Sequence, residues 1–158
     1  MKKYSVLLML FSSIAINHSA QAVDATMSFS GELVNAPCVI NNNGAINVPF
    51  GYVVTTQVDG TYKKQLVNYT LTCTATVPIT MKISGAPSLF TYAGTLQTSV
   101  SDLGIQLLEG TTPINLNTAW TFNPTAKPVL YAVPVKRSGS TLSAQAFTAS
   151  ATMTVDYP

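Results

Sequence analysis

This 158-residue chain has a single histidine and few charged residues. Its one histidine, His18, lies within the first 22 residues, and charged residues make up only 9% of the sequence. Without a further histidine, Ser–His and Cys–His catalytic pairs and the commonest metal ligand are missing. The six acidic residues are scattered singly, and no glycine-rich phosphate loop or D-x-D calcium loop occurs. We therefore expect neither an enzyme nor a protein that needs a cofactor or metal ion.

Long apolar runs are also missing, except at the N-terminus. Lys2 and Lys3 precede the apolar run Val6–Ile16, and Ala20-Gln21-Ala22 has the form of a cleavage site. Secretory signal peptides have this order of features, so residues 1–22 are predicted to be removed; a retained membrane anchor is the alternative. Without Lys2 and Lys3, the chain has six basic and six acidic residues, so its net side-chain charge is zero. A chain with no net charge is not expected to bind nucleic acid.

Cysteine occurs only twice, at Cys38 and Cys73. Two cysteines in an exported protein most simply form one disulfide bond, because compartments outside the cytoplasm are oxidising. Closing a loop of about 35 residues is worth roughly 3–4 kcal/mol on the chain-entropy model. Two free thiols or a metal site are the alternatives, and no nearby residues would complete a ligand set.

What the sequence has in abundance is the alternation of apolar and polar residues that is typical of β-strands. It recurs between turns of glycine, asparagine and proline, and no segment has the pattern of a helix. The apolar positions of the expected strands are Ile46, Val48 and Phe50; Val67, Tyr69, Leu71 and Cys73; Ile79, Met81 and Ile83; Leu103, Ile105 and Leu107; and Val129, Tyr131, Val133 and Val135. Seven or more short strands at this spacing predict an all-β sandwich with Greek-key connections.

The last residues of the chain alternate most regularly of all. The apolar side chains expected on one face of this strand are Phe147, Ala149, Ala151, Met153, Val155 and Tyr157. A strand this apolar needs a neighbour on each side, yet only Pro158 follows it. Either an earlier strand covers the free edge or another molecule does.

A second alternating run follows the expected cleavage site. Ala25, Met27, Phe29, Gly31 and Leu33 occupy one parity, and polar residues occupy the other. One interpretation is the first strand of the sandwich, with one face buried. Gly31 argues against it, because glycine weakens a strand interior and usually marks a place where another backbone or a bulky side chain comes close. The other interpretation is a strand that leaves its own domain.

These features together resemble the chaperone–usher pilins, the subunits of type 1 and P pili. The shared pattern covers essentially the whole mature chain. It consists of the signal peptide, an extension ending in Ser28–Val34, the sequence Ala36-Pro37-Cys38-Val39-Ile40, the second cysteine, and a terminal strand with a penultimate tyrosine. One departure is Gln145, which stands fourteen residues from the C-terminus where the family usually has glycine.

The resemblance implies an incomplete immunoglobulin-like sandwich, a pilin domain of residues 35–158 that lacks its final strand. Residues 23–34 would be an N-terminal donor-strand extension that completes a neighbouring subunit in trans. Its side chains Ala25, Met27, Phe29 and Leu33 would fill that neighbour's groove, with Gly31 where the groove is too narrow for a side chain. The strand from Phe147 to Tyr157 would form one edge of the groove, occupied first by a periplasmic chaperone.

The resemblance also predicts partners and location. The expected partners are the periplasmic pilus chaperone, an outer-membrane usher and neighbouring pilus subunits, and the expected location is the bacterial cell surface, reached through the periplasm. The predicted function is a structural pilus subunit that polymerises by donor-strand exchange and contributes to adhesion, with any receptor met only through the assembled pilus. Pro37-Cys38, the asparagine-rich turn and Phe50-Gly51 look closer to minor tip-adaptor subunits than to shaft pilins.

Two other functions stay open on the sequence. One is a carbohydrate- or protein-binding adhesin domain, for which Trp120 and Phe122 would form a sugar-stacking platform rather than part of an alternating core strand. The other is a closed secreted domain that folds stably without a partner.

Overall fold

A computed structural model describes residues 26–31, 38–74, 76–90 and 92–157. The chain divides into two units, Met1–Glu32 and Leu33–Pro158. In the first unit, residues 26–31 have no regular secondary structure. The predicted signal peptide and the expected donor residues Ala25 and Leu33 lie outside the described residues. No helix among the residues described is long and apolar enough to cross a membrane.

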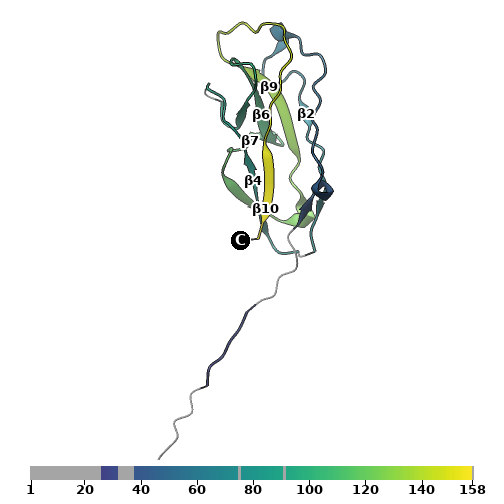
Figure 1. Cartoon of the computed structure of the whole chain (residues 1–158), viewed down its shortest axis with the longest axis vertical. Helices are drawn as coiled ribbons and strands as arrows, with labels where there is room; N and C mark the ends of the chain where they lie inside the picture. The colour runs from purple at the N-terminus through teal and green to yellow at the C-terminus, as the bar shows by residue number, and fades with distance from the viewer. Residues whose placement is uncertain (1–25, 32–37, 75, 91, 158) are drawn as a thin grey trace, which may run out of the picture. The chain divides into compact units, whose positions relative to one another are not determined.

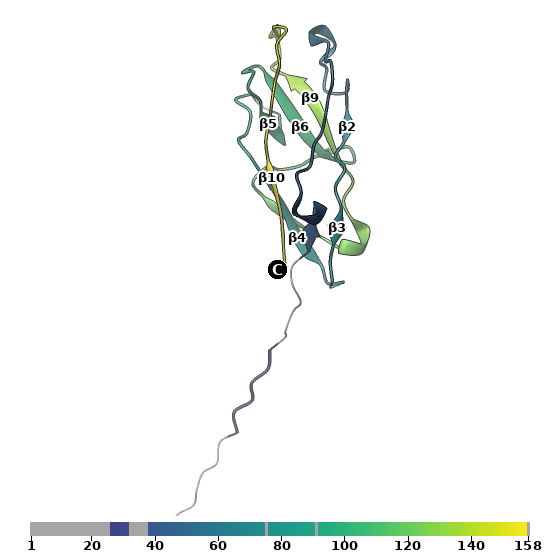
Figure 2. The same cartoon turned by 45° about the vertical axis from the view of Figure 1, so that its right-hand side comes forward.

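The second unit is built from antiparallel strands with three short 3₁₀ turns, as Figures 1 and 2 show. The turns are η1 (Asn41–Asn43), η2 (Thr55–Gln57) and η3 (Pro124–Ala126). One sheet has the order β2 (Gln65–Leu66), β9 (Leu130–Lys136), β6 (Leu103–Glu109) and β5 (Thr95–Gln97), and β7 (Thr112–Pro113) also pairs with β6. A second sheet has the order β10 (Thr152–Asp156), β4 (Ile79–Ser84) and β8 (Ala119–Phe122), and β1 (Val39–Ile40) pairs with β3 (Leu71–Thr72).

The core lies between the sheets and follows the alternation of the sequence. On β4, Ile79, Met81 and Ile83 are buried and the residues between them are not. Met81 and Ile83 pack with side chains of the larger sheet, among them Leu96, Ile105, Leu107, Leu130 and Ala132. A second cluster of Phe90, Leu108, Val133 and Val135 explains why β6 and β9 are buried on both faces. The prediction of an all-β sandwich is confirmed.

The predicted disulfide bond is present between Cys38 and Cys73. The two cysteines flank the short pair β1–β3, in which Val39 lies opposite Thr72. The bond therefore fixes the start of the second unit to a strand 35 residues further along the chain.

The expected single strand from Val67 to Cys73 forms a strand only at β3, Leu71–Thr72, and β2, which precedes it, belongs to a different sheet. β2 pairs with β9, β3 pairs with β1, and the chain crosses between them over residues 67–70. Tyr69 anchors the crossing, because its hydroxyl donates to the carbonyl oxygen of Pro128 at 2.7 Å. Burial, with a smaller contribution from the charge of Glu109, raises the pKa of Tyr69 to about 12. Any extended segment alternates, so alternation cannot show where a strand changes partner.

The terminal strand is also shorter than its alternation predicted. Only Thr152–Asp156 forms a ladder, with Thr152 opposite Ser84 and Asp156 opposite Thr80. Residues 147–151 have no strand pairing, and Thr148 is held instead by the backbone N–H and hydroxyl of Ser99, at 2.9 and 3.1 Å. The ladder stops because β4 ends at Ser84. The next residue, Gly85, bonds to the side chain of Asn117 instead: its N–H donates to Oδ1, and its carbonyl oxygen accepts from Nδ2.

Candidate functional site: an open apolar groove

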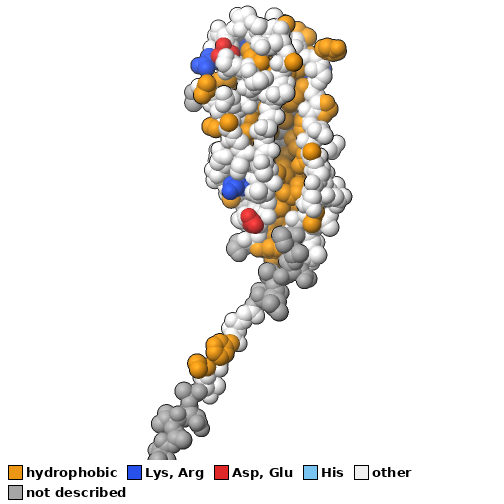
Figure 3. Space-filling view, viewed as in Figure 1, with side chains coloured by type: hydrophobic (Ala, Val, Ile, Leu, Met, Phe, Trp, Pro, Cys, Tyr) orange, Lys and Arg blue, Asp and Glu red, His pale blue; other side chains and the backbone are white. Residues whose placement is uncertain are grey.

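A groove of about 1440 Å³ runs along the second unit, between residues 43–53 on one side and 142–156 on the other. Figure 3 shows it as a continuous band of hydrophobic side chains between two ridges. Asp156 is the only charged residue that lines it among those described. Such a surface suits an apolar segment and offers no means of holding a charged ligand.

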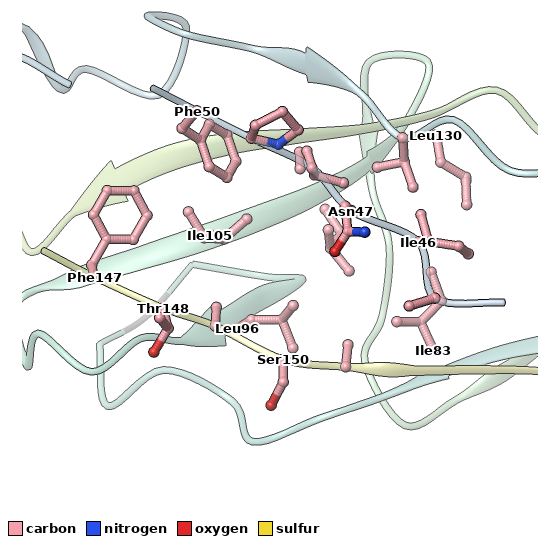
Figure 4. A pocket seen from close by; sticks show the side chains of 18 of the residues that line it. Ile46, Asn47, Phe50, Ile83, Leu96, Ile105, Leu130, Phe147, Thr148 and Ser150 are labelled. Atoms are coloured by element: carbon pink, nitrogen blue, oxygen red, sulfur yellow. The ribbon is translucent and has the colours of Figure 1, made fainter. Parts of the chain in front are cut away.

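The floor of the groove is the core of the sandwich itself. Ile83, Leu96, Ile105 and Leu130 belong to the buried cluster and also line the groove (Figure 4). The sandwich is therefore open on this side, where core side chains that are each no more than 4% exposed form the bottom of the groove.

Both walls present backbone groups that have no partner. β10 is the outermost strand of its sheet and pairs only with β4. On the other side, residues 46–53 form no strand and no backbone–backbone hydrogen bond with any described residue. An edge with unpaired N–H and C=O groups is a template for a further strand. Two such edges face each other here across an apolar floor.

The two walls come together at Phe50 and Phe147. The rings of Phe50 and Phe147 lie with their centroids 6.0 Å apart and their planes inclined by 41°. Figure 4 shows them pointing toward each other from opposite walls. The groove continues on both sides of this contact, because Val58, Leu103 and Leu142 also line it. We call this contact the aromatic crossbar.

The residues expected from the sequence are divided between the two units. Phe147, Ala149, Ala151, Met153 and Val155 all line the groove, whereas Tyr157 does not. The hydroxyl of Tyr157 is instead buried without a hydrogen-bond partner among the described residues. In the first unit, Met27 and Phe29 are 78% and 90% exposed, and a Cβ at Gly31 would meet no atom within 4 Å.

Sequence reasoning did not assign the opposite wall or the floor to the site. Ile46, Val48 and Phe50 line the groove, and each is only half-buried. Their alternation predicts an ordinary strand, but residues 46–53 form none. No local signal distinguishes them, because an extended segment that borders a groove alternates in the same way as an ordinary strand.

The pair considered for sugar stacking, Trp120 and Phe122, does not line the groove. Trp120 and Phe122 are on β8, half-buried, and both pack against the core cluster. Within the described part of the chain no group of three or more His, Cys, Asp or Glu residues could hold a metal ion.

An open all-β sandwich with an apolar groove between two unpaired edges is the fold of pilus subunits. The P pilus adaptor subunit PapF superposes with a TM-score of 0.61 at 24% identity, covering 78% of this chain and 97% of PapF. The P pilus rod subunit PapA superposes with a TM-score of 0.66 at 19% identity, covering 84% of this chain and 99% of PapA.

Sequence comparison gives the family. Residues 27–158 match the family described as fimbrial protein. Among relatives from Escherichia coli (strain K12), the uncharacterized fimbrial-like protein YfcQ is 36% identical over 99% of both chains, and YfcR is 39% identical over 79% of this chain and 76% of YfcR. The chain belongs to the fimbrial protein family. It is a structural pilus subunit rather than an enzyme, and the family's place is the surface pilus.

Proposed function

We propose that the groove accepts a β-strand from another molecule and that this subunit polymerises by donor-strand exchange in a chaperone–usher pathway. The observation that supports this most is the pair of facing, unpaired edges, β10 and residues 46–53, on either side of the apolar groove. A strand between them would find backbone partners on both sides and an apolar floor below. Addition of a strand to an exposed edge is a general mode of peptide recognition, and chaperone–pilin complexes are an example of it.

The donor is residues 23–34 of a neighbouring subunit. Met27 and Phe29 are large apolar side chains on one face of an extended segment, and both are exposed. Burying Met27, Phe29 and Leu33 at about 1.5–3 kcal/mol each would contribute about 5–9 kcal/mol before any backbone hydrogen bond is counted. That is enough to make the strand-filled state the stable form of the fibre.

A periplasmic chaperone fills the same groove before assembly, and an outer-membrane usher is where the exchange takes place. The chaperone is needed because an apolar groove of this size in a free subunit would promote aggregation. The subunit's position is that of a minor component near the tip of the pilus. Its contribution to adhesion comes through the assembled fibre.

Deleting residues 23–34 tests the donor role. The shortened subunit should still be recovered in complex with its chaperone, since the groove lies within residues 38–156. It should fail to donate to a neighbour, so fibres should end where it is incorporated. A matched control replaces Ser28 and Ser30 by alanine, on the other face of the same segment. Normal fibres from the deletion variant would refute the proposal.

A further inference from the structure

We propose that Asn43 is a site of chemical modification, where the folded subunit deamidates itself, and that the side chain of Asn41 sets the rate. Asn43-Gly44 is the only asparagine–glycine pair in the chain. Glycine has no side chain to shield its backbone nitrogen, so the asparagine before it is the one most open to attack. The reaction needs water and no enzyme.

The reaction is an attack by the backbone on a side chain. The nitrogen of Gly44 loses its proton and forms a bond to Cγ of Asn43, and Nδ2 of Asn43 leaves as ammonia. Water then opens the cyclic imide at either of its carbonyl carbons, which gives aspartate or isoaspartate. In sum, an amide and a water molecule become a carboxylate and ammonium, and nothing is oxidised or reduced.

Asn43 lies in a strained turn. The residues of η1, Asn41, Asn42 and Asn43, have φ of 47°, 49° and 61°, in the left-handed region. Residues other than glycine visit this region singly, although asparagine tolerates it better than most. A run of them costs free energy relative to an open turn, so we expect η1 to open more easily than the paired strands of the sandwich.

Among the described residues, the hydrogen bonds that close this turn all involve Asn41. Its backbone N–H donates to the carbonyl oxygen of Thr70 at 2.9 Å, and its carbonyl oxygen accepts from the N–H of Gly44 at 2.8 Å. Its side-chain Nδ2 donates to the carbonyl oxygens of Gly44 and Ala45, at 3.1 and 2.8 Å. We call the two side-chain bonds the Asn41 clamp.

The clamp keeps the attacking nitrogen from its target. The N–H of Gly44 is bound to Asn41, so its proton is protected until that bond opens. The clamp also holds the carbonyl oxygen of Gly44, so Gly44 cannot reorient toward Cγ of Asn43 while the clamp is closed. Asn43 itself is exposed, and its side chain forms no hydrogen bond with any described residue. The barrier to reaction therefore lies in Asn41 and not in Asn43.

Asp59-Gly60 is the comparable acidic pair, and there the side chain is restrained. Oδ1 of Asp59 accepts from the N–H groups of Thr61 and Tyr62, both at 2.8 Å, and from the hydroxyl of Thr61 at 2.9 Å. A carboxylate held in this way cannot turn toward the nitrogen of Gly60. We therefore expect Asn43 to react and Asp59 to stay unchanged.

The product changes the lining of the groove. Asn43 lines it, and Asp156 is the only charged residue there among those described. Deamidation adds a carboxylate next to the wall formed by residues 46–53, and isoaspartate also lengthens the main chain by one carbon. Subunits of different ages would thus differ in charge at this end of the groove.

The test compares reaction rates in matched variants. The mature subunit is isolated with its bound partner and incubated at mildly alkaline pH. Conversion of Asn43 is followed by mass spectrometry of its peptide and by enzymatic methylation of isoaspartate. Asn41→Gly removes the clamp and keeps a residue that accepts positive φ. Asn42→Gly makes the same change one residue later, where the side chain forms no hydrogen bond with a described residue.

Asn41→Gly should convert about five- to tenfold faster than wild type, the effect of losing hydrogen bonds of ordinary net strength. Asn42→Gly should stay within about twofold of wild type, as is usual for an exposed position. The urea-unfolded chain should react faster than the folded wild type and gives the rate without any protection.

Conversion of Asn43 ahead of every other asparagine, and faster in Asn41→Gly than in Asn42→Gly, supports the inference. Equal rates in Asn41→Gly and wild type overturn the role of the clamp, as do equal rates in the folded and unfolded chains. If the unfolded chain reacts at Asn43 while the folded proteins, Asn41→Gly included, stay unmodified, Asn43 is not a modification site of the subunit. None of these measurements requires strand exchange, so their failure leaves the proposed function standing.

Discussion

Replacing Phe29 by alanine should weaken the hold of one subunit on the next more than any other single truncation in the donor segment. The ring is 90% exposed in the free chain, so nearly all of its surface is available to be buried in the groove. Met27, at 78% exposure, is the next largest contributor among the described donor residues. Ser28 lies between the two in sequence and faces the other way.

The size of the effect follows from the area that the ring buries. Truncation of a fully buried phenylalanine to alanine costs about 3–5 kcal/mol. The donor lies at the mouth of an open groove, so the lower end of that range applies. A loss of about 3 kcal/mol corresponds to a change of roughly a hundredfold in the dissociation constant.

The assay is dissociation of purified fibres at rising guanidinium concentration, with released subunits measured by gel electrophoresis. Fibres of the Phe29→Ala subunit should come apart at a clearly lower concentration than wild-type fibres, and Met27→Ala should lie between them. Ser28→Ala should behave as wild type, because its side chain points away from the groove. Equal midpoints for Phe29→Ala and Ser28→Ala would show that this face of the segment is not buried in the fibre.

Two further predictions concern the body of the subunit. Tyr69 has a folded-state pKa of about 12 against an ordinary value of 10.0, so the stability it contributes is complete below pH 10 and is lost as the pH rises toward 12. An absorbance titration of tyrosinate should show one late-ionising residue that Tyr69→Phe removes; the same late step in both proteins would contradict this. Replacing Cys38 and Cys73 by alanine should lower the free energy of unfolding of the strand-complemented subunit by about 3–4 kcal/mol, measured by urea unfolding. A change below about 1 kcal/mol would mean that the loop is already constrained in the unfolded chain.

The strands whose two faces differ in polarity could be predicted with few errors. Ile79, Met81 and Ile83 alternate in the sequence and are the buried positions of β4. Leu103–Glu109 forms β6 and Leu130–Lys136 forms β9, where the sequence indicated strands over Leu103–Leu107 and Val129–Val135. Pro134 lies where β9 pairs only with β6, because β2 reaches no further than Tyr131 and Ala132. The missing N–H of proline costs no ladder hydrogen bond there.

The errors arose where a strand changes partner. The segment from Val67 to Cys73 alternates throughout but crosses between sheets at Tyr69, and the terminal strand leaves β4 at Thr152 although its alternation begins at Phe147. Side-chain period depends on the extended backbone alone, whereas pairing depends on which strand lies alongside.

The sequence by itself determined that the terminal segment, residues 147–157, alternates apolar and polar side chains and that a second alternating run stands at residues 25–33. Both runs can be recognised from the order of residues alone, because side chains of an extended strand alternate between its two faces. Only the tertiary structure decided what faces the open edge. It places Ile46, Val48 and Phe50 across from residues 147–151 and brings two phenylalanines 97 positions apart into contact, so the width of the groove varies along its length. That width depends on side chains from distant segments meeting across a gap, which no local pattern records.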